Sequence, residues 1–297
     1  MPLFLFFSSE AAALNWKVRA VLAFAKQIGF GWRAKALAAC LAVPLKLAGP
    51  RAAVAMKNID IVFPELSPAE KRKILRESYD NLVWTGIETL AQQRDPASRQ
   101  AWIHEVEGRE YFEAAMKEGK GIIGLAAHIG NWELAASILA SYVPITAVIR
   151  NPDNSFYCEL IEATRGSAGI KTLDKRAPMI RGVSALRRGE VFGIMPDQHG
   201  GNEGIVVPFF GAKTSTLPGP AVFAYLTGAP IIPIQLTRLA PFKFKMIIDQ
   251  PIEWKKLKDR ESTIMDITVK ANRCIEKMIL RAPGQWLWQH RRFREIT

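Results

Sequence analysis

Apolar and polar positions along residues 105–281 are arranged in blocks that predict strands and helices in turn. Short apolar runs bounded by turn residues, such as GIIGLAA and VFGIMP, are typical of buried strands. Longer runs with helical spacing, such as NWELAASILASY, lie between them. The expected strands are 121–127, 144–150, 169–173, 191–196, 229–239 and 242–254, and the expected helices are 131–142, 154–166, 178–189, 219–228 and 261–281. Strands alternating with helices predict an α/β domain with a largely parallel or mixed sheet flanked by helices.

The amino-terminal segment has a different pattern, in which basic and apolar residues mix almost without acids. Residues 1–57 hold eight basic residues against a single acid, Glu10. Leu14, Val18 and Ile28 share one helical arc. A basic amphipathic helix with aromatic residues predicts an interfacial membrane anchor. The alternative is a helical hairpin that only packs on the main domain.

Turn and cap residues divide the chain and mark where helices begin. The Gly49-Pro50 break predicts a membrane-associating helical region over 1–50 and a main domain over 51–297. Ser67 and Glu70 have the spacing of a capping box, which predicts a helix start. Asp95-Pro96 predicts a second start of the same kind.

Charge and cysteine content limit the classes of partner and compartment. The 297 residues carry a net charge of +12, which favours nucleic acid, anionic lipid, phosphorylated small molecules or an acidic protein as partners. Three widely spaced cysteines predict no disulfide framework and a reducing compartment. The chain has no stretch of about 18 uncharged apolar residues, so we expect no clean membrane-spanning helix.

Several familiar motifs are either absent or stand in the wrong structural context. GKGIIG matches a dinucleotide fingerprint, but its glycines follow a helical stretch and precede a strand, so a helix end and a turn are expected. The chain contains neither G-x-S-x-G nor H-E-x-x-H, and its four histidines are scattered. We therefore expect no nucleophilic serine of that type, no catalytic metal and no cofactor. The chain contains no zinc-finger or RNP-like motif, so we do not expect it to bind nucleic acid.

His128 and Glu133 form the strongest candidate for reaction chemistry. His128 follows a buried strand, and Asn131 can cap the next helix. The carboxyl ends of strands in an open α/β sheet are where ligands bind. A neutral histidine there can take the proton of an attacking hydroxyl, while a nearby carboxylate holds its tautomer. From these residues alone, a buried histidine bonded to a structural glutamate is equally favoured.

Ordered blocks along the chain resemble a known family. HIGNWE, RNPDN, ATRG, MPDQHGG and VPFFGAKTSTLPG occur in the order found in the bacterial late acyltransferases of lipid A biosynthesis, of lauroyl or myristoyl type, within the lysophospholipid acyltransferase group. The resemblance covers roughly residues 50 to 293 and makes 51–297 an acyltransferase domain. It implies a glycerol-phosphate-acyltransferase-like fold. The implied reaction moves a fatty acyl chain from acyl carrier protein, or from coenzyme A, to a hydroxyl of a lipid A precursor.

The resemblance also assigns roles to residues. His128 would be the general base, Glu133 and Asp197 its candidate carboxylate partners, and Arg165 the group that stabilises an oxyanion or holds a phosphate. Which carboxylate contacts His128 stays open, and structural roles for Arg165 and Asp197 are the alternatives. The expected substrate-binding residues are Asn131, Trp132, Arg150, Asn151, Gln198, Phe209, Phe210 and Thr216. For either phenylalanine, a place in the core is an equal alternative.

Location and partners follow from the same resemblance. We expect attachment to the cytoplasmic face of the bacterial inner membrane, with acyl carrier protein, anionic lipid and the lipid A precursor as partners. Lys26, Arg33, Lys35 and Lys46 interrupt the apolar anchor that the family usually has, which favours a surface-lying helix over a single span. Other relatives acylate glycolipids such as mannosylated phosphatidylinositol, so the acceptor stays open. A hydrolase using the same histidine and a non-catalytic basic membrane protein are the remaining alternatives.

Overall fold

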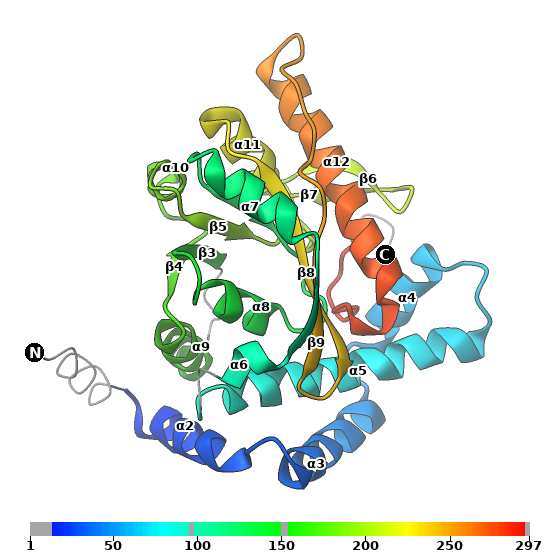
Figure 1. Ribbon diagram of the computed structural model, residues 1–297. Coiled ribbons are helices and arrows are strands. Elements are labelled where there is room, and N and C mark those ends of the chain that lie inside the picture. The colour runs from blue at the N-terminus through cyan, green and yellow to red at the C-terminus, as the bar shows by residue number, and fades with distance from the viewer. Residues whose placement is uncertain (1–13, 95–97, 150–153, 295–297) are drawn as a thin grey trace, which may run out of the picture.

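A computed structural model describes residues 14–94, 98–149 and 154–294. Its helices are α2 (Trp16–Ile28), α3 (Trp32–Ala48), α4 (Ala52–Val62), α5 (Pro68–Ala91), α6 (Ser98–Ala101), α7 (Arg109–Lys117), α8 (Trp132–Leu139), α9 (Ser155–Ser167), α10 (Met179–Arg187), α11 (Gly219–Thr227) and α12 (Arg260–Arg281). Its strands are β1 (Ile103–Glu107), β2 (Ile122–Leu125), β3 (Ile145–Ile149), β4 (Ile170–Asp174), β5 (Val191–Ile194), β6 (Ile205–Phe209), β7 (Ala212–Thr216), β8 (Ile231–Ala240) and β9 (Lys243–Ile248). Figure 1 shows their arrangement around a central sheet.

The central sheet has seven strands in the order β1-β9-β8-β2-β5-β3-β4. The strands from β8 to β4 are parallel, whereas β9 runs antiparallel to β8 and pairs in parallel with β1. The predicted α/β class with a largely parallel, mixed sheet is therefore confirmed. Every strand expected from the apolar runs has a counterpart in this sheet, because most of these runs are buried between two helical layers. The expected strand 242–254 is shorter than predicted and ends at Ile248, and the edge strand β4 is only partly buried.

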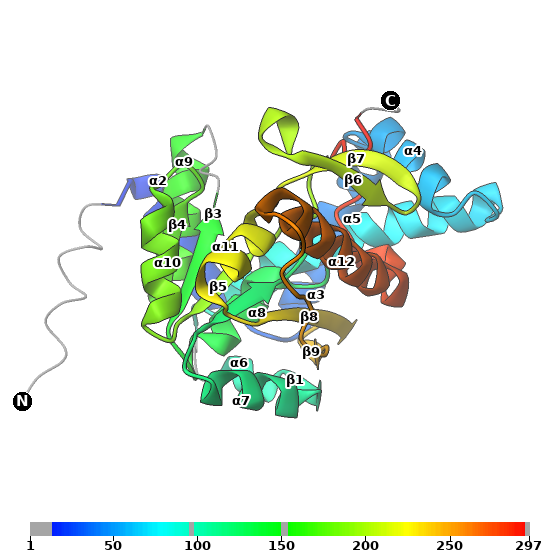
Figure 2. The same ribbon diagram turned by 90° about the horizontal axis from the view of Figure 1, so that it is seen from above.

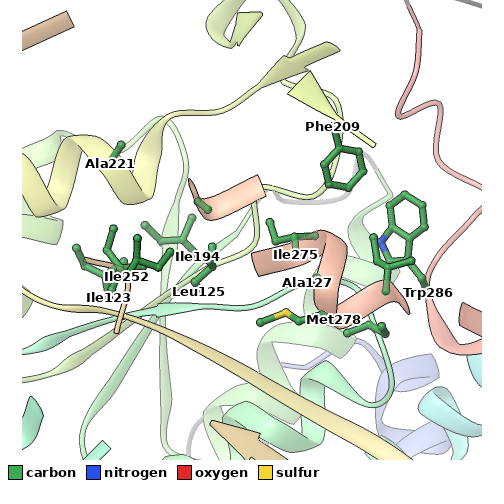
Figure 3. Close-up of a cluster of buried hydrophobic side chains, with 14 of the residues drawn as sticks. Ile123, Leu125, Ala127, Ile194, Phe209, Ala221, Ile252, Ile275, Met278 and Trp286 are labelled. Carbon is green, nitrogen blue, oxygen red and sulfur yellow. The ribbon is translucent and has the colours of Figure 1, made fainter. Parts of the chain in front are cut away.

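Alternate residues of the central strands face two separate cores. Ile123 and Leu125 pack with side chains of α11 and α12, in the cluster that Figure 3 shows. Ile122 faces the opposite layer, where it packs with Leu134 and Ile138 of α8. Figure 2 shows β8 lying between α12 on one side and α7 on the other. The face toward α8 is the one that carries the cavity described below.

Three strands, β1, β6 and β7, were not expected from the sequence. The strand β1 is a mostly exposed, polar edge strand, so it has no apolar run to reveal it. The β6–β7 hairpin packs beside α12 (Figure 2), and Pro208 interrupts its apolar pattern. The capping box at Ser67 is confirmed, because its hydroxyl accepts from the Glu70 amide and the Glu70 carboxylate accepts from the Ser67 amide. The second expected start, at Asp95-Pro96, lies outside the described residues.

The amino-terminal helices lie along α5, at the bottom of the molecule in Figure 1. Ala25, Ile28 and Ala38 pack against Val83 and Ile87 of α5, so one face of the α2–α3 pair belongs to the folded domain. Among the described helices, none is by itself long and apolar enough to cross a membrane. The joined pair α3 and α4 meets that length and composition test, but its two helices are bent by 83° at their junction.

Candidate active site

His128 and Asp197 meet because their strands are neighbours in the sheet. Leu125 at the end of β2 pairs with Ile194 at the end of β5, and each reactive residue lies a few positions beyond its strand. The His128 Nδ1 atom is 2.8 Å from Asp197 Oδ1. The His128 backbone N–H donates to Asp197 Oδ2 at 2.9 Å, and Trp286 Nε1 donates to the same oxygen at 2.9 Å. Asp197 is therefore the carboxylate in direct contact with the histidine.

The two side chains shift each other's pKa in opposite directions. Burial of the imidazole opposes its protonation, but the adjacent Asp197 carboxylate and the charge of Glu133 outweigh that effect and raise the pKa of His128. Burial also opposes ionisation of Asp197, but the histidine and the donated hydrogen bonds lower the pKa of this carboxyl to about 2. Asp197 is 1% exposed and stays ionised, while the histidine side chain is 20% exposed. An N–H at Nδ1 thus faces a buried acceptor, and Nε2 is left as the basic atom.

Glu133 has a different partner from the one that the H-x4-E spacing suggests. Its carboxylate accepts two hydrogen bonds from Arg165, from Nε at 2.9 Å and from Nη2 at 2.5 Å. Both side chains are largely buried, so this bidentate pair is fixed in orientation. Glu133 acts on His128 only through its charge, whereas Asp197 makes the contact.

The turn that holds His128 is shaped by Gly130. Gly130 has a φ of +60°, and a Cβ there would lie 1.8 Å from the Leu236 carbonyl oxygen, so only glycine fits. Its carbonyl accepts from Asn81 Nδ2 at 3.1 Å and from Thr85 Oγ1 at 2.9 Å, both on α5. The Leu287 amide donates to the His128 carbonyl at 3.0 Å. Backbone and α5 together fix the position of the imidazole.

Asn131 links this turn to a buried ion pair. Its side-chain oxygen accepts from the Leu134 amide at 2.9 Å, which confirms the predicted cap of α8. Its Nδ2 donates to Glu88 at 3.0 Å, and Arg238 donates to the same carboxylate at 2.6 Å. Glu88 is fully buried. Asn131 is 0% exposed, so in this structure its side chain positions the turn.

An apolar cavity opens beside the pair. It lies between α8, α9 and the sheet and has a volume of about 80 Å³. Trp132, Glu133 and Arg165 line the end nearest His128, and the Trp132 ring packs edge-on to the imidazole at 5.4 Å between centroids. Space of about 10–15 Å³ holds one water, so the cavity has room for several methylene-sized groups, and its lining is mostly apolar.

The other predicted binding residues lie apart from this cavity. Phe209 and Thr216 are fully buried, Phe209 against Trp286 (Figure 3) and Thr216 as acceptor of a hydrogen bond from Arg292. Phe210 is partly buried, and its amide donates to Glu276. The Gln198 carbonyl accepts from Arg292 at 3.2 Å. These four residues support the hairpin and the Asp197 loop. Arg150 and Asn151 lie outside the described residues.

In the described part of the chain, no three histidine, cysteine, aspartate or glutamate side chains converge as metal ligands would. His199 and His290 contact each other instead, since the His199 amide donates to His290 Nε2 at 3.0 Å. Burial lowers the pKa of His290 to about 4, so this imidazole stays neutral.

Sequence reasoning missed the residues that support the pair from a distance. Trp286 lies close to the end of the chain, and Glu88 and Arg238 lie on α5 and β8. No motif or spacing marks them, because their roles arise only when distant segments pack together. The unusual feature that could have drawn attention to Glu88 is an acid within the apolar face of a predicted helix.

The chain is similar in sequence to known bacterial enzymes. The sequence profile of the family described as "Bacterial lipid A biosynthesis acyltransferase" matches residues 7–295. A lipid A biosynthesis palmitoleoyltransferase of Escherichia coli K12 is 28% identical over 247 residues, covering 82% of this chain and 79% of its own. A lauroyltransferase of the same organism is 29% identical over 248 residues, with the same coverage. A lipid A biosynthesis acyltransferase of Haemophilus influenzae is 29% identical over 276 residues, covering 90% of this chain and 82% of its own.

Proposed function

Since this chain belongs to the bacterial lipid A biosynthesis acyltransferase family, we propose that it moves a fatty acyl chain from a thioester donor to a hydroxyl of a lipid A precursor. The observation that supports this reaction best is the His128–Asp197 pair at the carboxyl ends of β2 and β5, beside an apolar cavity. The pair supplies a base, and the cavity supplies a place for hydrocarbon. No cofactor takes part in the proposed reaction.

The chemistry follows from the hydrogen bonds of the imidazole. The acceptor hydroxyl attacks the thioester carbonyl carbon while His128 Nε2 takes its proton. Asp197 stabilises the imidazolium that forms, because its carboxylate accepts from Nδ1. The attack forms the new C–O bond, and collapse of the tetrahedral intermediate re-forms the carbonyl and breaks the C–S bond. The imidazolium then protonates the leaving thiolate, and His128 returns to its neutral form.

Arg165 is the candidate for binding negative charge next to this centre. A guanidinium has five N–H donors, and Glu133 accepts from Nε and Nη2 only. The remaining donors can hold the oxyanion of the intermediate or a phosphate of the acceptor. Glu133 fixes the orientation of the guanidinium in either role.

The donor and its carrier fit the charge of the protein. A net charge of +12 favours association with an acidic acyl carrier protein, and coenzyme A is a second anionic donor. Transfer from both donors, compared at equal concentration, distinguishes them.

We also propose that α2 and α3 lie on the cytoplasmic surface of the inner membrane. Trp16, Phe24 and Trp32 are more than half exposed, although their helices pack on α5. Phe24, Trp32 and Arg33 line one groove between the two helices, and cationic side chains lie over the rings of both tryptophans. Residues 14–57 contain no acid. Exposed aromatic rings beside cations are typical of a surface that enters the headgroup region of an anionic bilayer.

Replacing Trp16 and Trp32 together by alanine is expected to weaken binding to vesicles of anionic phospholipid by about tenfold per residue. The reason is that full burial of a large apolar side chain stabilises by about 1.5–3 kcal/mol, and part of that is gained at an interface. Vesicle sedimentation measures the loss. Tyr142→Ala, which removes another exposed aromatic ring outside this surface, is the control and keeps wild-type binding. Equal loss in both variants would contradict the membrane surface.

The proposed reaction is tested by mass spectrometry of lipid products. The purified chain is incubated with a lipid A precursor lacking secondary acyl chains and with a fatty acyl thioester. A precursor that gains the mass of one acyl chain supports the proposal. Gain on a mannosylated phosphatidylinositol instead would keep the chemistry and replace the acceptor. Release of free fatty acid with no acylated lipid would make the chain a thioester hydrolase.

A further inference from the structure

The residues that line the apolar cavity form two ends along the sheet. Near His128 its wall consists of Trp132, Ala126 and Met195, and at the opposite end it consists of Leu139, Ile145, Val191 and Ile170. The cavity follows β3 from Ile149 down to Ile145, a distance of about 13 Å at 3.3 Å per residue. The end away from His128 is lined by apolar side chains alone, which suits a hydrocarbon chain.

Halfway down, the wall is formed by residues that have almost no side chain. Gly193 of β5 pairs in register with Gly124 of β2 on one side and with Ala147 of β3 on the other. All three line the cavity. Glycine in a strand interior weakens the strand and often marks a site where a ligand approaches the backbone closely. The pair of adjacent glycines here therefore indicates that a ligand occupies the space above them.

Gly193 differs from its neighbour in how much space lies above it. A Cβ on Gly124 would lie 3.3 Å from Val191 Cγ1, which is a tight contact. A Cβ on Gly193 would meet only the Ala147 Cα atom, at 4.0 Å. A methyl group at position 193 would therefore fit against the cavity without displacing any protein atom.

From these contacts we infer that Gly193 sets the length of acyl chain that the enzyme transfers, with Leu139 and Ile145 at the end of the cavity away from His128. The inference rests on the proposed function for the nature of the occupant, which is the acyl chain of the donor. The chain enters past Trp132, passes over Gly193 and ends against Leu139. The two Escherichia coli relatives carry names that specify different chains at nearly equal identity to this protein, so overall similarity leaves the chain length open.

Gly193→Ala and Gly193→Val test the inference in a competition among acyl thioesters of graded length, with one acceptor and products separated by mass. Each methylene that a pocket accepts or excludes changes selectivity by about 10–200-fold. We expect Gly193→Ala to shift the product distribution to shorter chains. In Gly193→Val, transfer of the chain that the wild type prefers should fall at least tenfold relative to transfer of the shortest chain. Gly86→Ala, at an exposed helical glycine with open space around it, is the control and keeps the wild-type distribution.

Leu139→Ala provides the opposite test, because it shortens a side chain at the end away from His128 and should lengthen the preferred chain. General destabilisation cannot lengthen the preference in one variant and shorten it in another. An unchanged distribution in folded Gly193→Val would overturn the inference. A change of acceptor with an unchanged donor profile would also overturn it, since the cavity would then hold the acceptor's chain.

Displacement of a fluorescent fatty acid separates this inference from the proposed reaction. If the wild-type protein transfers no acyl chain but still binds fatty acids with a length preference that Gly193→Val shortens, the cavity keeps its role and the reaction is wrong. If transfer occurs and neither binding nor transfer depends on position 193, the reaction stands and the length determinant is wrong.

Discussion

Replacing His128 by alanine should abolish acyl transfer in a protein that stays folded. A positioned general base contributes about 10²–10⁴-fold to a rate, so we expect a loss of at least that size in the rate of product formation. His128 Nε2 has no hydrogen-bond partner among the described residues, and Nδ1 is directed at Asp197. The imidazole is therefore oriented for reaction with a group from outside the protein. Mass spectrometry of the acylated acceptor measures the rate.

The same variant distinguishes catalysis from structure. His128→Ala leaves the Asp197 carboxylate with the Trp286 and backbone donors, so a moderate fall in melting temperature is expected. His104→Ala, at an exposed histidine on β1, is the matched control and should keep full activity. Hydrolysis of the thioester by water should fall in parallel with transfer, because both use the same base. Transfer near the wild-type rate in folded His128→Ala would show that the histidine is a structural residue.

Local sequence signals predicted the parts of this protein that depend on near neighbours. The capping box at Ser67 and the cap at Asn131 are set within three residues. The central strands were predictable because both their faces are buried, which leaves continuous apolar runs. The hairpin β6–β7 was missed since Pro208 and its exposed positions break both simple patterns.

The site could be predicted only in part, since its pairing depends on the sheet. His128 stood out by following a strand, but the choice between Glu133 and Asp197 required knowing that β2 and β5 are neighbours and in which register. The sequence left both acids as candidates, while the sheet places the one 69 residues away in contact. The support from Glu88 and Arg238 is equally non-local, so no window of sequence contains it.

Replacing Asp197 by asparagine should both slow transfer and move its pH dependence. The reaction needs the neutral imidazole, so kcat/KM in the wild type rises with pH through the raised pKa of His128 and is level above it. Asparagine removes the adjacent negative charge that opposes the effect of burial. The pKa of His128 should then fall, and the rise in kcat/KM should occur at lower pH than in the wild type.

The level reached above that rise should also be lower, because asparagine can donate to Nδ1 and place the hydrogen on Nε2, where a base needs a lone pair. A carboxylate-to-amide change in a Ser-His-Asp triad, which has the same arrangement, lowers kcat by about 10⁴. Glu133→Gln provides the comparison: Glu133 acts on the imidazole through its charge alone, so its variant should shift the pH limb less than Asp197→Asn does. A larger shift for Glu133→Gln would mean that the carboxylate paired with Arg165 in this structure contacts His128 in the working enzyme. If kcat/KM of Asp197→Asn rises at the same pH as in the wild type, the rise reports the ionisation of a group other than His128.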